Sequence, residues 1–249
     1  MNFDNVISVR SNKTIYRDGD KCIKMYNPEC SKVAVLNAAL NQARIEAMGL
    51  GTPKLIEVTT VDGKTAIISE YIEGKSLAQL MEENPDKRDE YMELFVDLQM
   101  EIHSKTCSHL NPLRHDLDKK ILASDLNATT RYDLHARVAE MARDSKVCHG
   151  EYSPDNVIIS ESGKPYILDW AYANQGNALA DAAKTYLLFW LKGDITGAKK
   201  YLNIFCEKNN TDIKSVQRWI PVMAVAQSVD CDEKEREFLL SLVNAGDYK

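Results

Sequence analysis

The pattern of apolar and polar positions is mainly that of strands in the first seventy residues and mainly that of helices in the rest of the chain. Two Asp-Gly steps, Asp18-Gly19 and Asp62-Gly63, each separate short runs of strand composition, which is a strong signal for a hairpin. A helix is predicted over residues 32–48, because glycine and proline punctuate the chain at 49–53. The predicted strands of this part are residues 14–16, 21–26, 54–58 and 65–71.

From residue 77 onward the pattern is mainly helical, interrupted by one further hairpin. Residues 91–103 repeat apolar side chains at helical spacing, with His103 on a stripe that is predicted to face the core or a loop. The strand pattern breaks at residues 73–76, so a boundary between a smaller and a larger part of the chain is predicted near residue 72. The other predicted helices cover residues 77–81, 128–143, 179–191, 195–206, 213–229 and 233–243.

The later hairpin carries polar residues that suit a metal ion. If its turn is symmetric about Ser162 and Gly163, Asn156 lies opposite Asp169. Directly opposed residues have Cβ atoms about 4.5–5.5 Å apart, close enough for an amide oxygen and a carboxylate to bind one small cation. Mg²⁺ prefers such oxygen ligands and completes its shell with water and phosphates. The two apolar strands of this hairpin are predicted at residues 157–159 and 166–168.

Glu151 lies five residues before Asn156, on the loop that enters the same hairpin. Its carboxylate is placed to receive or orient a hydroxyl proton while a metal ion neutralises phosphates. Asp155 is expected to point to the opposite face from Asn156 if the strand has already begun there. An ordinary surface hairpin with polar ends is the alternative interpretation of these residues.

The sequence His-Gly-Glu-x-x-x-x-Asn at residues 149–156, followed by Ile-Leu-Asp-Trp at 167–170, resembles two segments of a known family. These are the catalytic and metal-binding segments of the aminoglycoside phosphotransferase and choline kinase-like family, relatives of the protein kinases. The family has aspartate where this chain has Glu151. The extra methylene moves the carboxylate by about 1.5 Å, and misplacements near 1 Å can cost about a hundredfold in rate.

The resemblance extends over almost the whole chain and implies an α+β, two-lobed protein kinase-like fold. It implies a small antiparallel β-rich nucleotide-binding lobe at residues 1–72 and a larger, mostly helical lobe with the catalytic and acceptor-binding residues at 73–249. Lys24 matches the strand lysine that contacts the α and β phosphates of ATP, although a lone strand lysine is otherwise most often a solvated charge. The loop that covers the phosphates contains Ser11 and Asn12 but no glycine. The hinge that binds adenine through its backbone corresponds to Glu70, Tyr71 and Ile72.

Further positions take roles from the same resemblance. His149 is expected to anchor the catalytic loop rather than to react. Asp181 matches a family aspartate that accepts backbone N–H bonds from that loop, and burying it unpaired in its apolar helix would be costly; an exposed helix charge is the alternative. The family's helix glutamate that orients the strand lysine is replaced here by Ala38, and Glu46 is a candidate substitute two turns later.

Composition narrows the classes of partner. The formal net charge of −6 over 249 residues argues against a nucleic-acid binder and is compatible with a small cationic substrate. The six cysteines are dispersed without a C-x-x-C pair, so neither a zinc site nor a disulfide framework is indicated. No apolar run reaches the roughly 18 residues that span a bilayer, and the N-terminus lacks the regions of a signal peptide. We therefore expect a cytoplasmic protein with reduced thiols and no membrane partner.

The predicted function is an ATP- and Mg²⁺-dependent small-molecule kinase that moves the γ-phosphoryl group to a hydroxyl acceptor, such as an aminoglycoside, a choline-like alcohol or a sugar. A catalytically weakened, nucleotide-binding pseudokinase-like protein is the alternative that Glu151 and Ala38 favour. A helical scaffold without a nucleotide site is a third hypothesis. The sequence does not indicate the oligomeric state.

The acceptor is not identified by the sequence. The resemblance assigns its binding to the C-terminal helices and to the loop after Asp169, where acidic and aromatic side chains would suit an amine-bearing sugar or a quaternary ammonium. The stronger interpretation of the acidic run at 230–237 is a solvated turn and helix start. The candidate acceptor residues are Trp170, Tyr172, Trp219, Gln227, Asp230 and Asp232.

Overall fold

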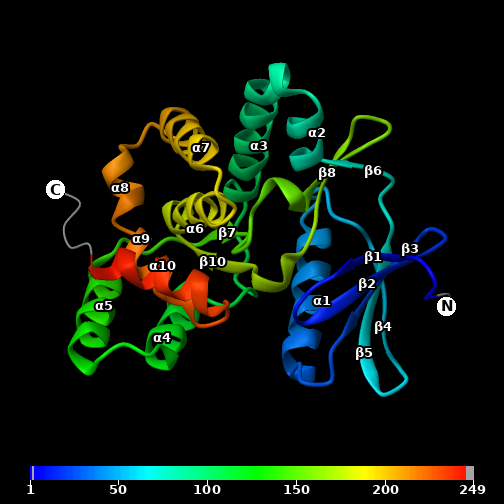
Figure 1. The fold of residues 1–249 in the computed structure, drawn as a ribbon, viewed down its shortest axis with the longest axis horizontal. Coiled ribbons are helices and arrows are strands. Elements are labelled where there is room, and N and C mark those ends of the chain that lie inside the picture. The colour runs from blue at the N-terminus through cyan, green and yellow to red at the C-terminus, as the bar shows by residue number, and fades with distance from the viewer. Residues whose placement is uncertain (2, 245–249) are drawn as a thin grey trace. The chain divides into compact units, whose positions relative to one another are not determined.

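The computed structural model describes residues 1 and 3–244 (Figure 1). Contacts between Cα atoms divide the chain into two compact units. The first unit comprises Met1–Arg88 and Pro154–Tyr172, and the second comprises Asp89–Ser153 and the chain from Ala173 on. This division differs from the predicted lobes at 1–72 and 73–249, which stay a prediction.

A five-stranded antiparallel sheet, in the order β1-β2-β3-β5-β4, forms the body of the first unit (Figure 1). Both predicted Asp-Gly hairpins are confirmed: Asp18 pairs with Lys21, and Val61 pairs with Lys64. The strands are β1 (Val6–Val9), β2 (Lys13–Asp18), β3 (Lys21–Tyr26), β4 (Leu55–Val61) and β5 (Lys64–Glu70).

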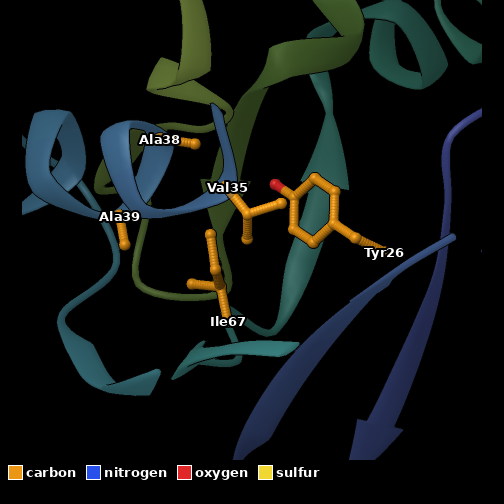
Figure 2. Close-up of a cluster of buried hydrophobic side chains, with 5 residues drawn as sticks. All are labelled: Tyr26, Val35, Ala38, Ala39 and Ile67. Atoms are coloured by element: carbon orange, nitrogen blue, oxygen red, sulfur yellow. The ribbon is translucent and has the colours of Figure 1, made fainter. Parts of the chain in front are cut away.

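One face of this sheet packs against the helix α1 (Lys32–Ala47). Because side chains alternate along a strand, Ile67 of β5 faces the helix while Ala66 and Ile68 pack on the opposite face. Lys24 pairs directly with Ile67 and therefore belongs to the helix-facing side. Figure 2 shows the buried residues of this contact, which are Tyr26, Val35, Ala38, Ala39 and Ile67.

The predicted later hairpin is present in the first unit, but its register differs from the expected one. Val157 pairs with Ile167, so Asn156 falls opposite Leu168 and the predicted opposition of Asn156 and Asp169 is wrong by one residue. The cause is a three-residue loop in place of a two-residue turn, closed by the hydrogen bond from Ser160 N to Lys164 O (2.9 Å). Gly163 supplies the positive φ of 81° that such a loop requires.

This hairpin consists of β8 (Val157–Ser160) and β9 (Pro165–Ile167), and β6 (Gly74–Ser76) pairs with β8 to make a three-stranded sheet. Ser76 caps the following helix, α2 (Leu77–Glu83), by accepting a hydrogen bond from Gln79 N. The 3₁₀ turns η1 (Pro85–Lys87), η2 (Pro154–Asn156) and η3 (Trp170–Tyr172) complete the first unit.

The second unit is helical apart from a short antiparallel ribbon of β7 (Lys146–Cys148) and β10 (Asn174–Gly176). The helix predicted over 213–229 is in fact two helices, because Pro221 has no N–H to donate and fits only the first turn of a helix. The helix α4 was not predicted. The helices are α3 (Arg88–His103), α4 (Leu113–Ala123), α5 (Ala128–Glu140), α6 (Ala178–Leu191), α7 (Ile195–Lys208), α8 (Ile213–Gln217), α9 (Ile220–Ser228) and α10 (Glu233–Asn244).

No helix within residues 3–244 combines the length and the apolar character that a bilayer-spanning segment needs. All six cysteines are free thiols, which agrees with the absence of a disulfide framework in the sequence pattern.

Candidate active site

Asp169 of the first unit follows β9 with a left-handed backbone, φ 64°. This conformation takes the residue out of strand geometry, so alternation along β9 no longer determines where its side chain points. The carboxylate binds two ammonium groups: Lys24 Nζ lies 3.2 Å from Oδ1, and Lys13 Nζ lies 3.0 Å from Oδ2 and 3.1 Å from Oδ1. Asp169 is thus the centre of a triad with Lys13 and Lys24.

Strand register explains why two lysines reach one carboxylate. Lys13 of β2 pairs with Tyr26 of β3, and Ile15 pairs with Lys24, so both lysines are on the same face of the sheet at diagonal positions. The Lys13 ammonium also lies over the Tyr26 ring, 5.6 Å from its centroid. The strand begins at Lys13 rather than at the predicted Thr14, and this is why the sequence interpretation left Lys13 in the loop.

Burial and charge act in opposite directions on this triad. Burial raises the pKa of Asp169, but the two ammonium groups outweigh it and hold that pKa below its usual value. For Lys13, burial outweighs the attraction of Asp169 and lowers its pKa. Two cations against one carboxylate leave the triad with net positive charge, which suits a phosphate group.

A cavity of about 300 Å³ lies in the first unit, and we name it the first cavity. It collects most of the residues that the sequence assigned to nucleotide and metal binding. Ser11 and Asn12 are exposed and are not among its lining residues, where Ser8 and Arg10 of the same segment are found instead. The assigned residues that line the cavity are Lys24, Glu70, Tyr71, Ile72, Asn156 and Asp169.

Among the oxygen-bearing side chains that line the first cavity are those of Asp155, Asn156 and Asp169. Asp155 was expected to face away if a strand had begun at that point, but residues 154–156 form the turn η2, so strand alternation does not apply. Two carboxylates and one amide are hard oxygen donors of the kind that Mg²⁺ takes in proteins. The donor set of the first cavity therefore fits this ion.

Two backbone N–H groups of the hinge segment donate to other parts of the first unit. Glu70 N donates to Lys54 O (2.9 Å), and Tyr71 N donates to Asp20 O (2.8 Å). The third residue of the hinge segment, Ile72, also lines the cavity, so its backbone N–H is the candidate donor to a bound base.

In the second unit, Asp181 of α6 gathers donors from the loop that carries the His-Gly-Glu sequence. Its Oδ1 accepts from Gly150 N (2.8 Å), and its Oδ2 accepts from His149 N (3.2 Å). Two side chains of α3 also donate to Oδ2: His103 through Nε2 (2.9 Å) and Gln99 through Nε2 (3.2 Å). Asp181 is 2 % exposed, so these bonds replace the water that its charge would otherwise need.

The electrostatics of Asp181 follow from these bonds. Burial raises its pKa, but the hydrogen bond from His103 and the donors of the loop outweigh burial and lower the pKa to about 2. Cys148 Sγ lies near the same groups, within 4.8 Å of the ligand atoms of His103 and Asp181. Burial raises the pKa of this thiol well above its usual value, and an uncharged thiol beside a fully hydrogen-bonded carboxylate is a poor metal site.

His149 and Glu151 take different environments on the same loop. His149 is fully buried, and its Nδ1 accepts a hydrogen bond from Glu151 N (3.2 Å). Gly150 between them has a φ of 80°, a conformation that favours glycine. The Glu151 carboxylate is partly exposed, with 30 % of its side-chain surface accessible, and lies 3.5 Å from Lys184 Nζ.

Comparison with known protein families identifies the family of this chain. The sequence model of the "Phosphotransferase enzyme family" matches residues 8–212. The chain belongs to this family. No curated protein sequence matches it.

Solved structures of other proteins share the fold of this chain. A thermostable mutant of aminoglycoside phosphotransferase APH(4)-Ia superposes with a TM-score of 0.70 at 14 % identity, over 98 % of this chain and 94 % of that one. Choline kinase LicA from Streptococcus pneumoniae gives 0.64 at 15 % identity, over 97 % and 95 %. At such low identity the likeness shows the fold alone, and it confirms the predicted α+β, protein kinase-like fold.

The helix that follows the strand lysine carries the alanine expected from the sequence resemblance in place of a glutamate. Ala38 is buried in the apolar contact between α1 and the sheet, so it offers no charge to Lys24 (Figure 2). Glu46, the candidate substitute, accepts a hydrogen bond from Leu55 N (3.0 Å). The carboxylate that binds Lys24 is that of Asp169.

Three residues of the candidate site were not predicted from the sequence. Lys13 required the strand to begin one residue earlier. His103 was expected in a core or a loop, and its position on the apolar stripe of α3 gave no sign of a carboxylate partner. Lys184 was visible only as a charge that interrupts an apolar run, and such a charge is the signal for a buried ion pair.

Proposed function

We propose that the protein transfers the γ-phosphoryl group of ATP to a hydroxyl group of a small molecule, with Mg²⁺ as the cofactor. The observation that carries the proposal is the first cavity, which is lined by Lys24, by the candidate metal ligands Asp155, Asn156 and Asp169, and by the hinge segment. Family membership supports phosphoryl transfer as the reaction class. Among the structurally similar proteins, APH(4)-Ia has been solved in a ternary complex with ADP and hygromycin B, and LicA in complex with AMP.

Different residues of the first cavity would bind different parts of the nucleotide. Ile72 offers its backbone to the adenine, and Lys24 offers its ammonium to the phosphates. Asp155, Asn156 and Asp169 would hold Mg²⁺, which supplies charge neutralisation at the transferring phosphoryl group. Because the transition state is loose, positioning and charge do most of the catalytic work.

Glu151 is the residue that we assign to the acceptor hydroxyl. Its carboxylate would accept a hydrogen bond from that hydroxyl and orient the oxygen for in-line attack on the γ-phosphorus. His149 and Asp181 do not react; they fix the loop on which Glu151 lies, through the bonds to Glu151 N and Gly150 N.

Two of the predicted acceptor residues near the C-terminal helices, Asp230 and Asp232, have structural partners. Asp230 forms an ion pair with Lys120, and Asp232 accepts from Glu235 N (2.9 Å) at the start of α10, as the alternative interpretation of a solvated helix start proposed. In the first unit, Trp170 is 1 % exposed and donates its indole N–H to Ile167 O (2.9 Å). The acceptor therefore stays unassigned.

A second cavity, of about 260 Å³, lies in the second unit and is lined by Trp219 and several apolar side chains. It includes Asp144 and Gly176, which lie at or beyond the Lys146 end of the β7–β10 ribbon. Glu151 follows the opposite, Cys148 end. Each strand residue adds about 3.3 Å, so the length of the ribbon lies between Glu151 and this end of the second cavity. The second cavity is therefore a poor candidate for binding the reacting hydroxyl.

Replacing Glu151 with alanine is expected to lower ATP-dependent turnover by about 10²–10⁴-fold, the usual contribution of a positioned acid or base. Nucleotide binding should be unchanged, because Glu151 does not line the first cavity. ADP release is measured across a panel of aminoglycosides, amino alcohols and sugars. Thermal unfolding with Mg-ATP reports binding, with about 2.7 kcal/mol of stabilisation at a hundred times Kd. The matched control is Glu161→Ala, which removes an exposed carboxylate from the hairpin loop.

A catalytically weakened, nucleotide-binding protein is the second candidate, favoured by Glu151 and Ala38. It predicts Mg-ATP stabilisation without ADP release for any acceptor in the panel. Absence of Mg-ATP stabilisation in the wild-type protein would contradict both candidates and favour the helical scaffold. A cytoplasmic location stays a prediction.

A further inference from the structure

Lys184 is a lysine inside the apolar helix α6 that is 6 % exposed, a placement that lysine rarely takes without a partner. Its ammonium lies 3.5 Å from Oε2 of Glu151. Removing an ammonium group from water is unfavourable unless an opposite charge compensates for it. The nearby carboxylate of Glu151 is therefore the group that makes this placement tolerable.

The same turn of α6 holds the backbone of the loop. Asp181 lies three residues before Lys184, so their side chains project from neighbouring positions on one helix face. Asp181 accepts hydrogen bonds from the backbone N–H groups of His149 and Gly150, and Lys184 binds the side chain of the next residue, Glu151. One helical turn thus fixes both the path of the loop and the carboxylate that it carries.

Side-chain length connects this ion pair to the departure from the family pattern. An aspartate on the same backbone would be shorter by one C–C bond, about 1.5 Å, so its carboxylate would lie about 5 Å from the ammonium. At that separation the direct contact of the ion pair is lost.

We propose that Lys184 is a positioning residue that fixes the Glu151 carboxylate, and that this pairing is why the chain uses glutamate where its family has aspartate. The inference rests on the proposed function, since it assumes that Glu151 orients the acceptor hydroxyl. Lys184 acts through Glu151 and touches neither nucleotide nor acceptor in this role.

A double-mutant cycle tests the proposal, using the wild-type protein, Lys184→Met, Glu151→Asp and the double variant. Turnover is measured as ADP release from Mg-ATP, with the best acceptor of the panel or with water as the acceptor. Lys184→Met is expected to lower kcat at least tenfold while KM for ATP changes less than twofold. Glu151→Asp should lower kcat in the wild-type background and have little effect in the Lys184→Met background. Lys184→Arg, which keeps the charge, should restore most of the loss.

The controls separate this role from a structural one and from the proposed function itself. Lys199→Met, an exposed lysine on α7, should leave kcat unchanged. Circular dichroism and thermal unfolding verify that each variant is folded, and Lys184→Arg serves if Lys184→Met is not. Additive effects of the two substitutions, or an arginine variant no better than methionine, would overturn the role of Lys184 alone. A wild-type protein that binds Mg-ATP but releases no ADP would overturn the proposed function and this role together.

Discussion

Replacing Asp169 with asparagine should abolish the Mg²⁺-dependent part of ATP binding and lower turnover by about a thousandfold or more. Asparagine keeps the size of the side chain and one oxygen but removes the charge to which both Lys13 and Lys24 bind. The two buried ammonium groups then repel each other without a counter-charge. We therefore also expect a loss of about 3–5 kcal/mol in the free energy of unfolding, the usual cost of breaking a buried ion pair.

Calorimetric titration of ATP, with and without MgCl₂, measures the first effect, and urea unfolding measures the second. The matched control is Asp62→Asn: Asp62 also has a left-handed backbone, φ 49°, but lies in the exposed turn between β4 and β5. Asparagine tolerates this conformation as well as aspartate does, so the control isolates the lost charge from the backbone effect. Unchanged Mg²⁺-dependent affinity in Asp169→Asn would remove Asp169 from the metal site.

Most of the local structure was predictable because the signals are local. The Asp-Gly hairpins, the helix after β3 and most helices of the second unit follow from turn residues and periodicity within one segment. The break before Pro221 is also a local signal, but the prediction of a single helix over 213–229 did not take it into account. Such features depend on a few neighbouring residues, which the sequence displays directly.

The register of the later hairpin was not predictable in the same way. Glu161, Ser162 and Gly163 are compatible with a two-residue turn or a three-residue loop, and the two differ by one residue in every pairing. Asp169 nevertheless lines the first cavity with Asn156, because its left-handed backbone departs from the strand. Asn156 and Asp169 therefore line the same cavity because of the left-handed backbone of Asp169, and not because they lie opposite each other in the hairpin.

Ion pairs between distant segments were the least accessible to sequence interpretation. Lys13 is separated from Asp169 by 156 positions, and only the register of β2 on β3 places it beside Lys24. The partner of Lys184 is Glu151, and the β8–β9 hairpin lies between these two residues in the sequence. A buried lysine is a visible anomaly in a sequence, but its partner is set by tertiary packing.

The substitution Asp181→Asn is expected to destabilise the protein by about 3–5 kcal/mol, because it breaks a buried charge-assisted network. The carboxylate accepts from His103, Gln99, His149 N and Gly150 N, whereas an amide has one acceptor oxygen and adds two donors. The loop that carries Glu151 loses its anchor in the same step, so turnover should fall with stability. Urea unfolding at pH 7 measures the loss, and Asp97→Asn, which breaks a surface ion pair with Lys208, should cost at most about 1 kcal/mol.

The pH dependence of unfolding tests the same carboxylate through its charge. The pKa of Asp181 falls from 3.8 to about 2 on folding, so the folded state binds its proton less readily than the unfolded state. The resulting stabilisation, about 2 kcal/mol, is fully present above pH 4 and is lost as the pH falls through the folded pKa. The Asn variant has no such group, so its free energy of unfolding should decline less steeply between pH 4 and pH 2 than that of the wild type. Parallel curves for the two proteins would mean that Asp181 is not held as a buried carboxylate and that another group anchors the loop.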